Sequence, residues 1–139
     1  MKETKTSDFR LKGYEFLSAG DNNKAIEYFL KAIDEGDALA CIDMVLEIKY
    51  VNDNYIYSEE SLEAISPEKF EYYLDLGIYL DSLDCMFYKA REQLIGDGFI
   101  DYNHKEAFRA LKRLKERNYE PVYFDEDYSI DDYLEIARN

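Results

Sequence analysis

Hydrophobic residues recur along this chain at the spacing of amphipathic helices. In residues 24–40, Ala25, Phe29 and Ala32 stand at positions i, i+4 and i+7, which lie on one face of an α-helix. The stripe ends at Gly36, and glycine commonly follows the last turn of a helix. A second apolar run starts soon afterwards, so the pattern predicts two consecutive helices separated by a tight break.

The same pattern occurs three times, in residues 24–40, 69–85 and 106–122. At the position of Gly36 the second copy has Asp81 and the third has Asn118, and both residue types suit the end of a helix. Small residues, among them Gly13 and Gly77, recur where paired helices need a close approach. Because one helical hairpin cannot bury its apolar face alone, three neighbouring copies predict a continuous core.

We therefore expect an all-α fold: a short α-solenoid of about three antiparallel helical hairpins plus a C-terminal capping helix, in one domain that spans residues 1–139. The expected boundaries are 7–36, 38–81 and 83–118 for the hairpins and 129–138 for the cap. Ser129 is a suitable N-cap for this last helix. Asp131 and Asp132 would stabilise its first turn, because negative charge is favourable near the N-terminus of a helix dipole.

Turn-forming residues predict two more helix starts and one irregular stretch. Ser66 is expected as an N-cap with Pro67 in the first helical position, and Asn103 begins a sequence that resembles a capping box. Residues 51–66 lengthen the first spacing between copies. We expect them to form a loop with one helical turn from Ser58 to Ala64.

The run from Phe9 to Asp37 resembles a tetratricopeptide repeat, whose period is about 34 residues. The matching signature positions are Gly13, Phe16, Gly20, Ala25, Phe29 and Ala32. The ending "EGDALA" (35–40) and the turn "GDGFIDYNHKEA" (96–107) more closely resemble the Sel-one-like branch. The middle copy departs from the pattern, since Phe70 replaces a signature alanine. The resemblance implies an α-solenoid that holds other proteins along a surface, as a scaffold rather than a catalyst.

Charge is abundant and uneven. The chain has 31 acidic and 17 basic residues and a formal net charge of −14, which predicts repulsion from nucleic acids and anionic membranes. Residues 34–86 carry 14 acids and 2 bases, whereas residues 104–117 carry 6 bases and 2 acids. A hydrophobic content of 47% excludes a wholly disordered chain. No run has the length of a membrane span or the pattern of a secretion signal, so we expect a cytoplasmic protein.

The residue types that catalysis needs are not assembled in this sequence. His104 is the only histidine, and it stands among polar residues at an expected helix start, so we expect it at the surface or as a cap rather than in a nucleophile set. Cys41 and Cys85 lack metal-ligand spacing and are expected as small buried hydrophobic residues. The acidic segment 125–135 lacks the spacing and the turn glycine of a calcium loop. We therefore expect no enzymatic activity, no cofactor and no metal.

Tyrosines within acidic segments predict a protein-binding surface. The chain has 14 tyrosines, and tyrosine supplies contact area at low entropic cost. The best candidates lie in the 51–63 insertion and the 123–133 segment, because loops carry variable contacts on a rigid scaffold. The candidate partner-binding residues are Tyr55, Tyr57, Glu59, Glu60, Tyr123, Asp125, Glu126, Asp127, Tyr128, Asp131, Asp132 and Tyr133.

Two functions fit these observations. The first is a non-catalytic protein–protein interaction module, a helical-repeat adaptor or scaffold, whose partner is another protein with a basic surface. The alternative is an acidic inhibitor that mimics nucleic acid and blocks a DNA- or RNA-binding enzyme. Direct binding of nucleic acid is not expected from the net charge. Self-association into a homo-oligomer stays open.

Overall fold

The predicted all-α fold class is confirmed. The computed structural model describes residues 6–124 and 127–139, and within these ranges it contains eight helices and no strand. The helices are α1 (Asp8–Ser18), α2 (Asn22–Asp34), α3 (Leu39–Lys49), α4 (Glu59–Ala64), α5 (Lys69–Tyr79), α6 (Leu83–Ile95), α7 (His104–Glu116) and α8 (Ile130–Arg138).

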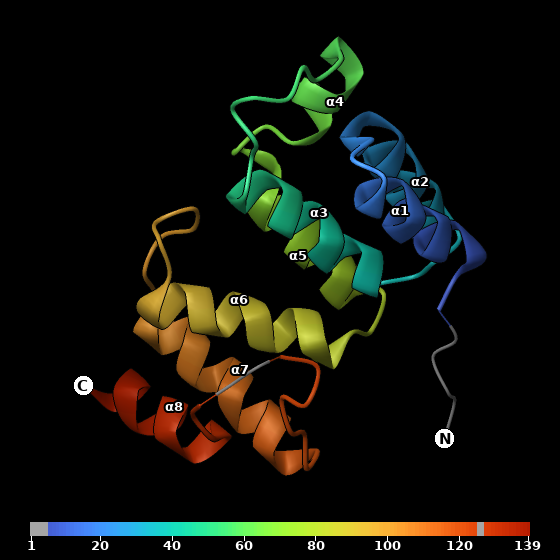
Figure 1. Ribbon diagram of the computed structural model, residues 1–139. Helices are drawn as coiled ribbons and strands as arrows, with labels where there is room; N and C mark the ends of the chain where they lie inside the picture. The colour runs from blue at the N-terminus through green and yellow to red at the C-terminus, as the bar shows by residue number, and fades with distance from the viewer. Residues whose placement is uncertain (1–5, 125–126) are drawn as a thin grey trace.

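The helices pack in sequence order as antiparallel neighbours. Helix α1 packs on α2, α3 on α5, and α6 on α7, while α8 covers α7 at the C-terminal end. Contacts of α2 with α3 and of α5 with α6 join successive pairs into one array. Figure 1 shows α4 projecting at one end of this array and α7 and α8 at the other. The two ends therefore present different surfaces.

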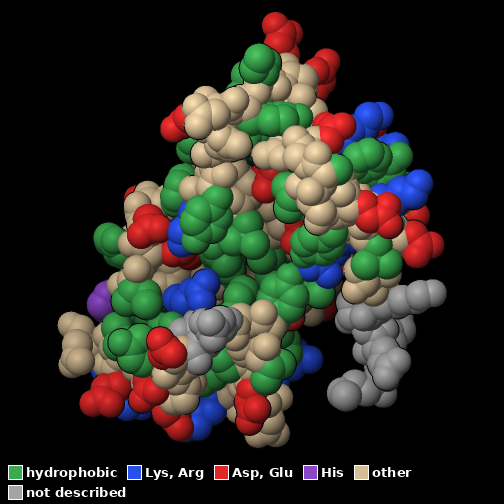
Figure 2. All heavy atoms as spheres, viewed as in Figure 1, with side chains coloured by type: hydrophobic (Ala, Val, Ile, Leu, Met, Phe, Trp, Pro, Cys, Tyr) green, Lys and Arg blue, Asp and Glu red, His purple; other side chains and the backbone are tan. Residues whose placement is uncertain are grey.

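Helix α6 divides the core into two clusters. Tyr88 packs with the side chains of the first two pairs, whereas its neighbour Phe87 packs with those of α7 and α8. Phe124, from the segment before α8, contacts both clusters. Figure 2 shows hydrophobic side chains gathered over the middle of the molecule and acidic side chains at the α4 end.

Two helix pairs approach so closely that only glycine fits at the contact. A Cβ on Gly77 would clash with the Sγ of Cys85 and would lie 2.9 Å from its Cβ. A Cβ on Gly13 would clash with the ring of Phe29 in the same way. Both positions match the expected close approaches of small residues, and Cys85 is buried as predicted.

The three breaks of the repeat share one backbone conformation. Gly36, Asp81 and Asn118 have φ values of 89°, 66° and 55°, in the left-handed region that ends many helices. The helix ends expected at these three positions are therefore confirmed. Asp81 and Asn118 adopt it although they carry a Cβ, which aspartate and asparagine tolerate better than most residues.

Helix starts agree with the sequence at three sites and differ at one. Ser58, Asn103 and Ser129 each accept a backbone hydrogen bond as an N-cap. The expectation for Ser66 is wrong, because α5 begins at Lys69 and the Ser66 side chain does not cap it. The carbonyl of Ser66 instead accepts from the Lys69 amide at 2.9 Å, so a turn precedes the helix.

Candidate protein-binding surfaces

The two tyrosines of the 51–63 insertion bind to their own chain. The Tyr55 hydroxyl accepts a hydrogen bond from the backbone amide of Asn23 at 3.0 Å, and the Tyr57 hydroxyl accepts one from the Asn22 side chain at 3.3 Å. Their rings form an edge-to-face pair with centroids 4.8 Å apart. Both side chains are half-buried. They therefore fix the insertion to the start of α2.

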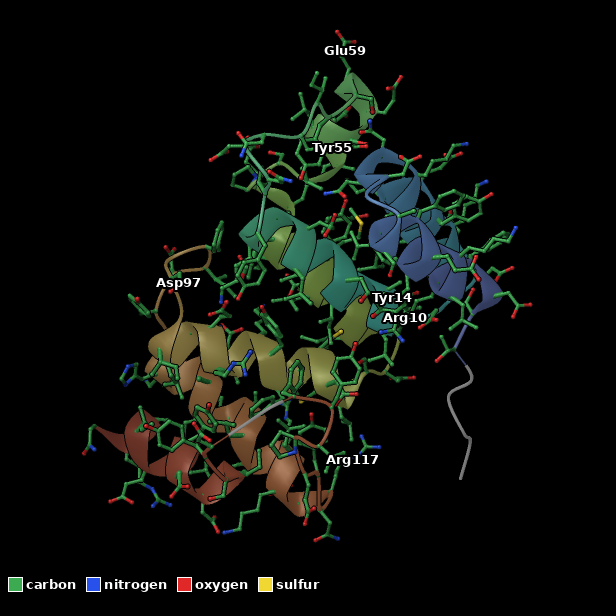
Figure 3. All side chains as sticks on the ribbon, in the orientation of Figure 1. Arg10, Tyr14, Tyr55, Glu59, Asp97 and Arg117 are labelled. Atoms are coloured by element: carbon green, nitrogen blue, oxygen red, sulfur yellow. The ribbon has the colours of Figure 1, made fainter. Side chains whose placement is uncertain are left out.

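Other residues of the insertion supply its outward surface. Ile56 is 89% exposed and Leu62 is 53% exposed, and Glu59 and Glu60 are exposed in the first turn of α4. Figure 3 shows Glu59 at the outer end of the molecule, with Tyr55 closer to the body. We call residues 56–63 the tip. Its exposed surface is acidic and aliphatic, because the Tyr57 side chain within it is half-buried.

Tyr123 lies in a segment that crosses from the end of α7 back to α1. We call residues 119–124 the return segment. The Arg10 guanidinium donates to the Tyr123 hydroxyl at 2.7 Å and to the Tyr14 hydroxyl at 2.6 Å. Arg10 also forms a buried ion pair with Asp43, with Nε and Oδ2 2.6 Å apart. This network joins the return segment to the first two helix pairs.

Within this network the buried carboxylate of Asp43 balances the charge of the buried Arg10 guanidinium. Burial raises the pKa of Asp43, and the hydrogen bonds from Arg10 and Tyr14 oppose that shift. Burial, together with the hydrogen bond to Asp43, raises the pKa of Tyr14, so its hydroxyl keeps its proton and donates. The cluster is thus a paired and hydrogen-bonded structural element, an arrangement in which buried charges are tolerated.

The predicted partner contact of Tyr133 is wrong. Tyr133 is fully buried, and its ring packs edge-to-face on Phe87 with centroids 5.5 Å apart. It belongs to the inward stripe of α8, with Ile130, Leu134 and Ala137. That stripe has helical spacing, so the sequence does carry the signal that Tyr133 faces the core.

The other acidic residues predicted to bind a partner in the C-terminal segment differ in their contacts and exposure. Asp132 closes a capping box with Ser129, so its carboxylate is bound within the chain. Asp127 and Asp131 are exposed, and Asp131 pairs with Lys115 at 2.5 Å. Asp125 and Glu126 lie outside the residues that the structure describes.

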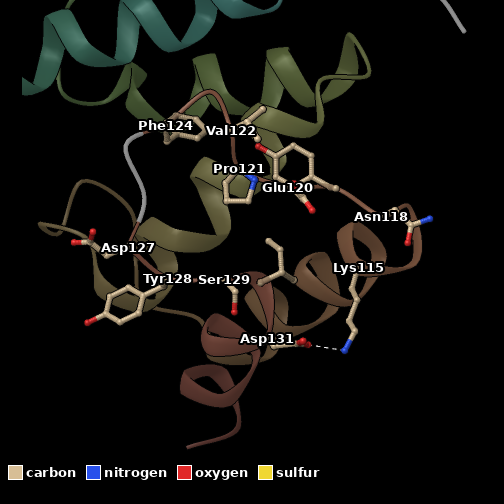
Figure 4. Close-up of a pocket in the computed structure, with 12 residues that line it drawn as sticks. Lys115, Asn118, Glu120, Pro121, Val122, Phe124, Asp127, Tyr128, Ser129 and Asp131 are labelled. Atoms are coloured by element: carbon tan, nitrogen blue, oxygen red, sulfur yellow. Dashed lines mark hydrogen bonds and ion pairs between the residues drawn. The ribbon is translucent and has the colours of Figure 1, made fainter.

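A pocket of about 580 Å³ lies between the end of α7, the return segment and the start of α8. We call it the C-terminal pocket. Its apolar lining includes Pro121, Val122 and Tyr128, and its acidic lining is Glu120, Asp127 and Asp131. Figure 4 shows these side chains around the opening. Val122 is 84% exposed and Tyr128 is exposed as well, so apolar contact area is offered to a ligand.

Sequence reasoning found Tyr128, Asp127 and Asp131 and missed Val122 and Pro121. A single valine in a polar segment gives no periodic signal, and the pocket is formed jointly by the end of α7, the return segment and the start of α8. The tip shows the same pattern, since Ile56 and Leu62 were not predicted as contact residues. In both places the aliphatic residues are recognisable as contact surface only from their exposure in the folded chain.

Within residues 6–124 and 127–139, no three histidine, cysteine, aspartate or glutamate side chains converge to hold a metal. His104 is exposed at the first position of α7. Burial raises the pKa of the Cys41 thiol to about 12 and that of Cys85 to about 11, so both stay protonated and unreactive at neutral pH.

No protein-family model matches this chain, and neither does any curated protein or any solved structure. Among the helices that the structure describes, none combines the length and the apolar character needed to cross a membrane. Function is therefore inferred from the surfaces themselves.

Proposed function

We propose that this protein is a non-catalytic interaction module of the cytoplasm, an adaptor or scaffold that binds a basic segment of another protein in the C-terminal pocket. One observation supports this most: exposed Val122 and Tyr128 lie in a single pocket that is also lined by the carboxylates of Glu120 and Asp127 and by the Lys115–Asp131 ion pair. An apolar anchor inside a charged rim is the usual anatomy of a protein-binding site.

The chemistry of the pocket suggests what its ligand presents. Tyr128 and Val122 favour an aliphatic or aromatic side chain, because each has apolar area that water now covers. Glu120 and Asp127 favour a lysine or arginine beside that side chain, and the overall charge of −14 steers a basic partner toward the surface. The resemblance of the first hairpin to tetratricopeptide-like repeats supports the same class of function.

The nucleic-acid-mimicking inhibitor is less well supported. A mimic needs a track of negative charge, as the phosphate backbone has. Helix α7 instead exposes five bases, Lys105, Arg109, Lys112, Arg113 and Lys115. These cations interrupt the acidic surface between the tip and the C-terminal segment, so the charge distribution favours an adaptor.

A pair of matched double variants tests the proposal. Val122→Ser with Tyr128→Ala removes the apolar anchors of the pocket, while Val51→Ser with Tyr50→Ala removes the same two residue types from an exposed position outside it. Partners captured from an extract of the source cell are identified by mass spectrometry. We expect the pocket variant to lose a basic partner by at least tenfold and the control to keep it. Equal capture by both variants would contradict the pocket as the binding site.

Neutralising the rim separates the two functions. Asp127→Asn with Asp131→Asn removes two carboxylates, and exposed charges contribute about 1 kcal/mol or less to a complex. An adaptor anchored by apolar contacts is expected to lose less than about tenfold in affinity, mostly through a slower association rate. A loss of several orders of magnitude, together with a partner that binds nucleic acid, would favour the mimic instead.

A further inference from the structure

A second groove, separate from the C-terminal pocket, lies between α5, α6 and α7 and has a volume of about 340 Å³. Its floor is apolar, with Ile78, Met86 and Ala90 from two helices. The floor also contains Gln93, which is only 3% exposed. Its side-chain amide is a polar group among the apolar residues that line the groove.

The charges of the groove are unequally satisfied. Lys89 is held by three carboxylates: Asp75 at 2.6 Å, Glu71 at 3.4 Å and Glu106 at 3.5 Å. Arg109 and Arg113 also line the groove, and neither forms an ion pair within residues 6–124 and 127–139. They are one turn apart on α7, so their side chains lie on the same face. Two adjacent guanidinium groups suit a carboxylate.

The groove therefore fits a ligand segment that is both acidic and aliphatic. Carboxylates would bind Arg109 and Arg113, a polar group would bind the Gln93 amide, and an aliphatic side chain would cover Ile78 and Met86. A ligand that is only acidic would leave the apolar floor in contact with water. A ligand that is only apolar would leave the two arginines without a counter-ion.

The tip of this chain has the chemistry that the groove requires. Glu59, Glu60 and Glu63 are exposed there, and Ile56 and Leu62 are the aliphatic side chains beside them. The tip is also the part of the molecule that projects furthest from α7, as Figure 1 shows. A chain cannot place its own tip in its own groove, so only a second copy can supply the contact.

We propose that the tip of one copy docks in the α5–α6–α7 groove of a second copy. Glu59 and Glu60 pair with Arg109 and Arg113 across this interface, and Leu62 covers the apolar floor. Because the two surfaces differ and lie at opposite ends, the contact is head-to-tail and builds chains or closed rings. The contact goes beyond the proposed function and uses none of the residues of the C-terminal pocket.

Sedimentation velocity of the full chain, from micromolar to near-millimolar concentration and at low and high salt, tests this contact. We expect assemblies that grow with concentration and dissociate as salt rises, because salt screens exposed charge pairs. Arg109→Glu with Arg113→Glu, and separately Glu59→Arg with Glu60→Arg, are each expected to weaken association at least tenfold. A chain that stays monomeric throughout the concentration range at low salt would overturn the proposal.

Mixing the two charge-reversed variants gives the sharpest result. Each reversed tip then meets a groove of opposite charge, so the mixture is expected to recover association that neither variant shows alone. Lys105→Glu with Lys112→Glu is the matched control, since it makes the same charge change on α7 outside the groove. A mixture that does not recover association, or a control that loses it equally, would refute the proposed pairing. All the exchanged residues are exposed, and circular dichroism verifies their folding.

Discussion

Arg10 and Tyr123 are hydrogen-bonded although 113 positions separate them in the chain, with Nη2 and the hydroxyl oxygen 2.7 Å apart. In helical-repeat arrays each unit usually contacts only its neighbours. Here the return segment passes beside α6 and reaches the first helix of the array. The N-terminal and C-terminal helix pairs are therefore coupled directly, and we expect the array to unfold as one cooperative unit.

Tyr123→Phe tests the strength of this coupling. The substitution removes one hydrogen bond to a charged group, so it is expected to lower the free energy of unfolding by about 1–3 kcal/mol. Urea titration followed by circular dichroism measures the change. Tyr102→Phe is the control, because the Tyr102 hydroxyl donates to the Gly96 carbonyl within an exposed local turn. An equal effect of the two variants would show that the link to Arg10 contributes nothing special.

Removing one partner of the buried Arg10–Asp43 ion pair is expected to lower the free energy of unfolding more than Tyr123→Phe does. Arg10→Met leaves the Asp43 carboxylate buried without its cation, and loss of one partner of a buried pair typically costs about 3–5 kcal/mol. The double variant Arg10→Met with Asp43→Leu removes both charges and is expected to recover most of that loss. The free energies of unfolding of the wild type, Arg10→Met, Asp43→Leu and the double variant form a double-mutant cycle. A double variant no more stable than Arg10→Met alone would contradict this account.

The helices and their ends could be predicted because their signals are local. Apolar spacing along the chain places Ala25, Phe29 and Ala32 in the core, and the residues at 36, 81 and 118 end their helices in one conformation. The buried pair of Arg10 and Asp43 has no such signal. Its partners are 33 positions apart, and nothing in the neighbouring sequence distinguishes this arginine from a solvated one.

The candidate sites were predicted only in part for the same reason. The segments were identified correctly as places where polar loops interrupt the helices, and the pocket does contain Tyr128 and Asp131. The sequence could not tell which tyrosines face outward, since that depends on how each loop packs. Tyr55 and Tyr57 bind the start of α2, and Tyr133 lies in the core.

Gly77→Ala tests the closest approach between helices. A methyl group at this position would displace the Cys85 side chain, and overpacking of a core typically costs about 1–3 kcal/mol. That cost is expected to exceed the gain of about 0.5–1 kcal/mol that alanine brings inside a helix. Thermal and urea unfolding give the difference.

Cys85→Ala in the same background identifies the cause. It removes the Sγ that the new methyl group would meet, although the Cβ of residue 85 stays close. The double variant is therefore expected to recover part of the stability lost in Gly77→Ala. If it loses the two single effects additively, the contact with Cys85 is not what makes glycine necessary at this position.

Glu47 makes the stability of the fold depend on pH. Its Oε1 is buried and has no hydrogen-bond partner among the described residues. Burial, and then the charge of Asp43 one turn earlier on α3, raises the pKa of Glu47 from 4.5 to about 7. Between these two values the unfolded chain has already released the proton that the folded chain still binds. The free energy of unfolding therefore falls as pH rises from about 4.5 to about 7.

Glu47→Gln removes this dependence, because the amide is neutral at every pH. Near pH 5 the variant and the wild type are expected to be about equally stable, and near pH 8 the variant is expected to be more stable by on the order of 2 kcal/mol. Glu116→Gln removes the same charge from an exposed position on α7 and is expected to change stability little at either pH. Urea titrations at both pH values measure all three chains. A gain for Glu47→Gln that is the same at pH 5 and pH 8 would mean that relief of the net negative charge, and not the buried carboxylate, stabilises the variant.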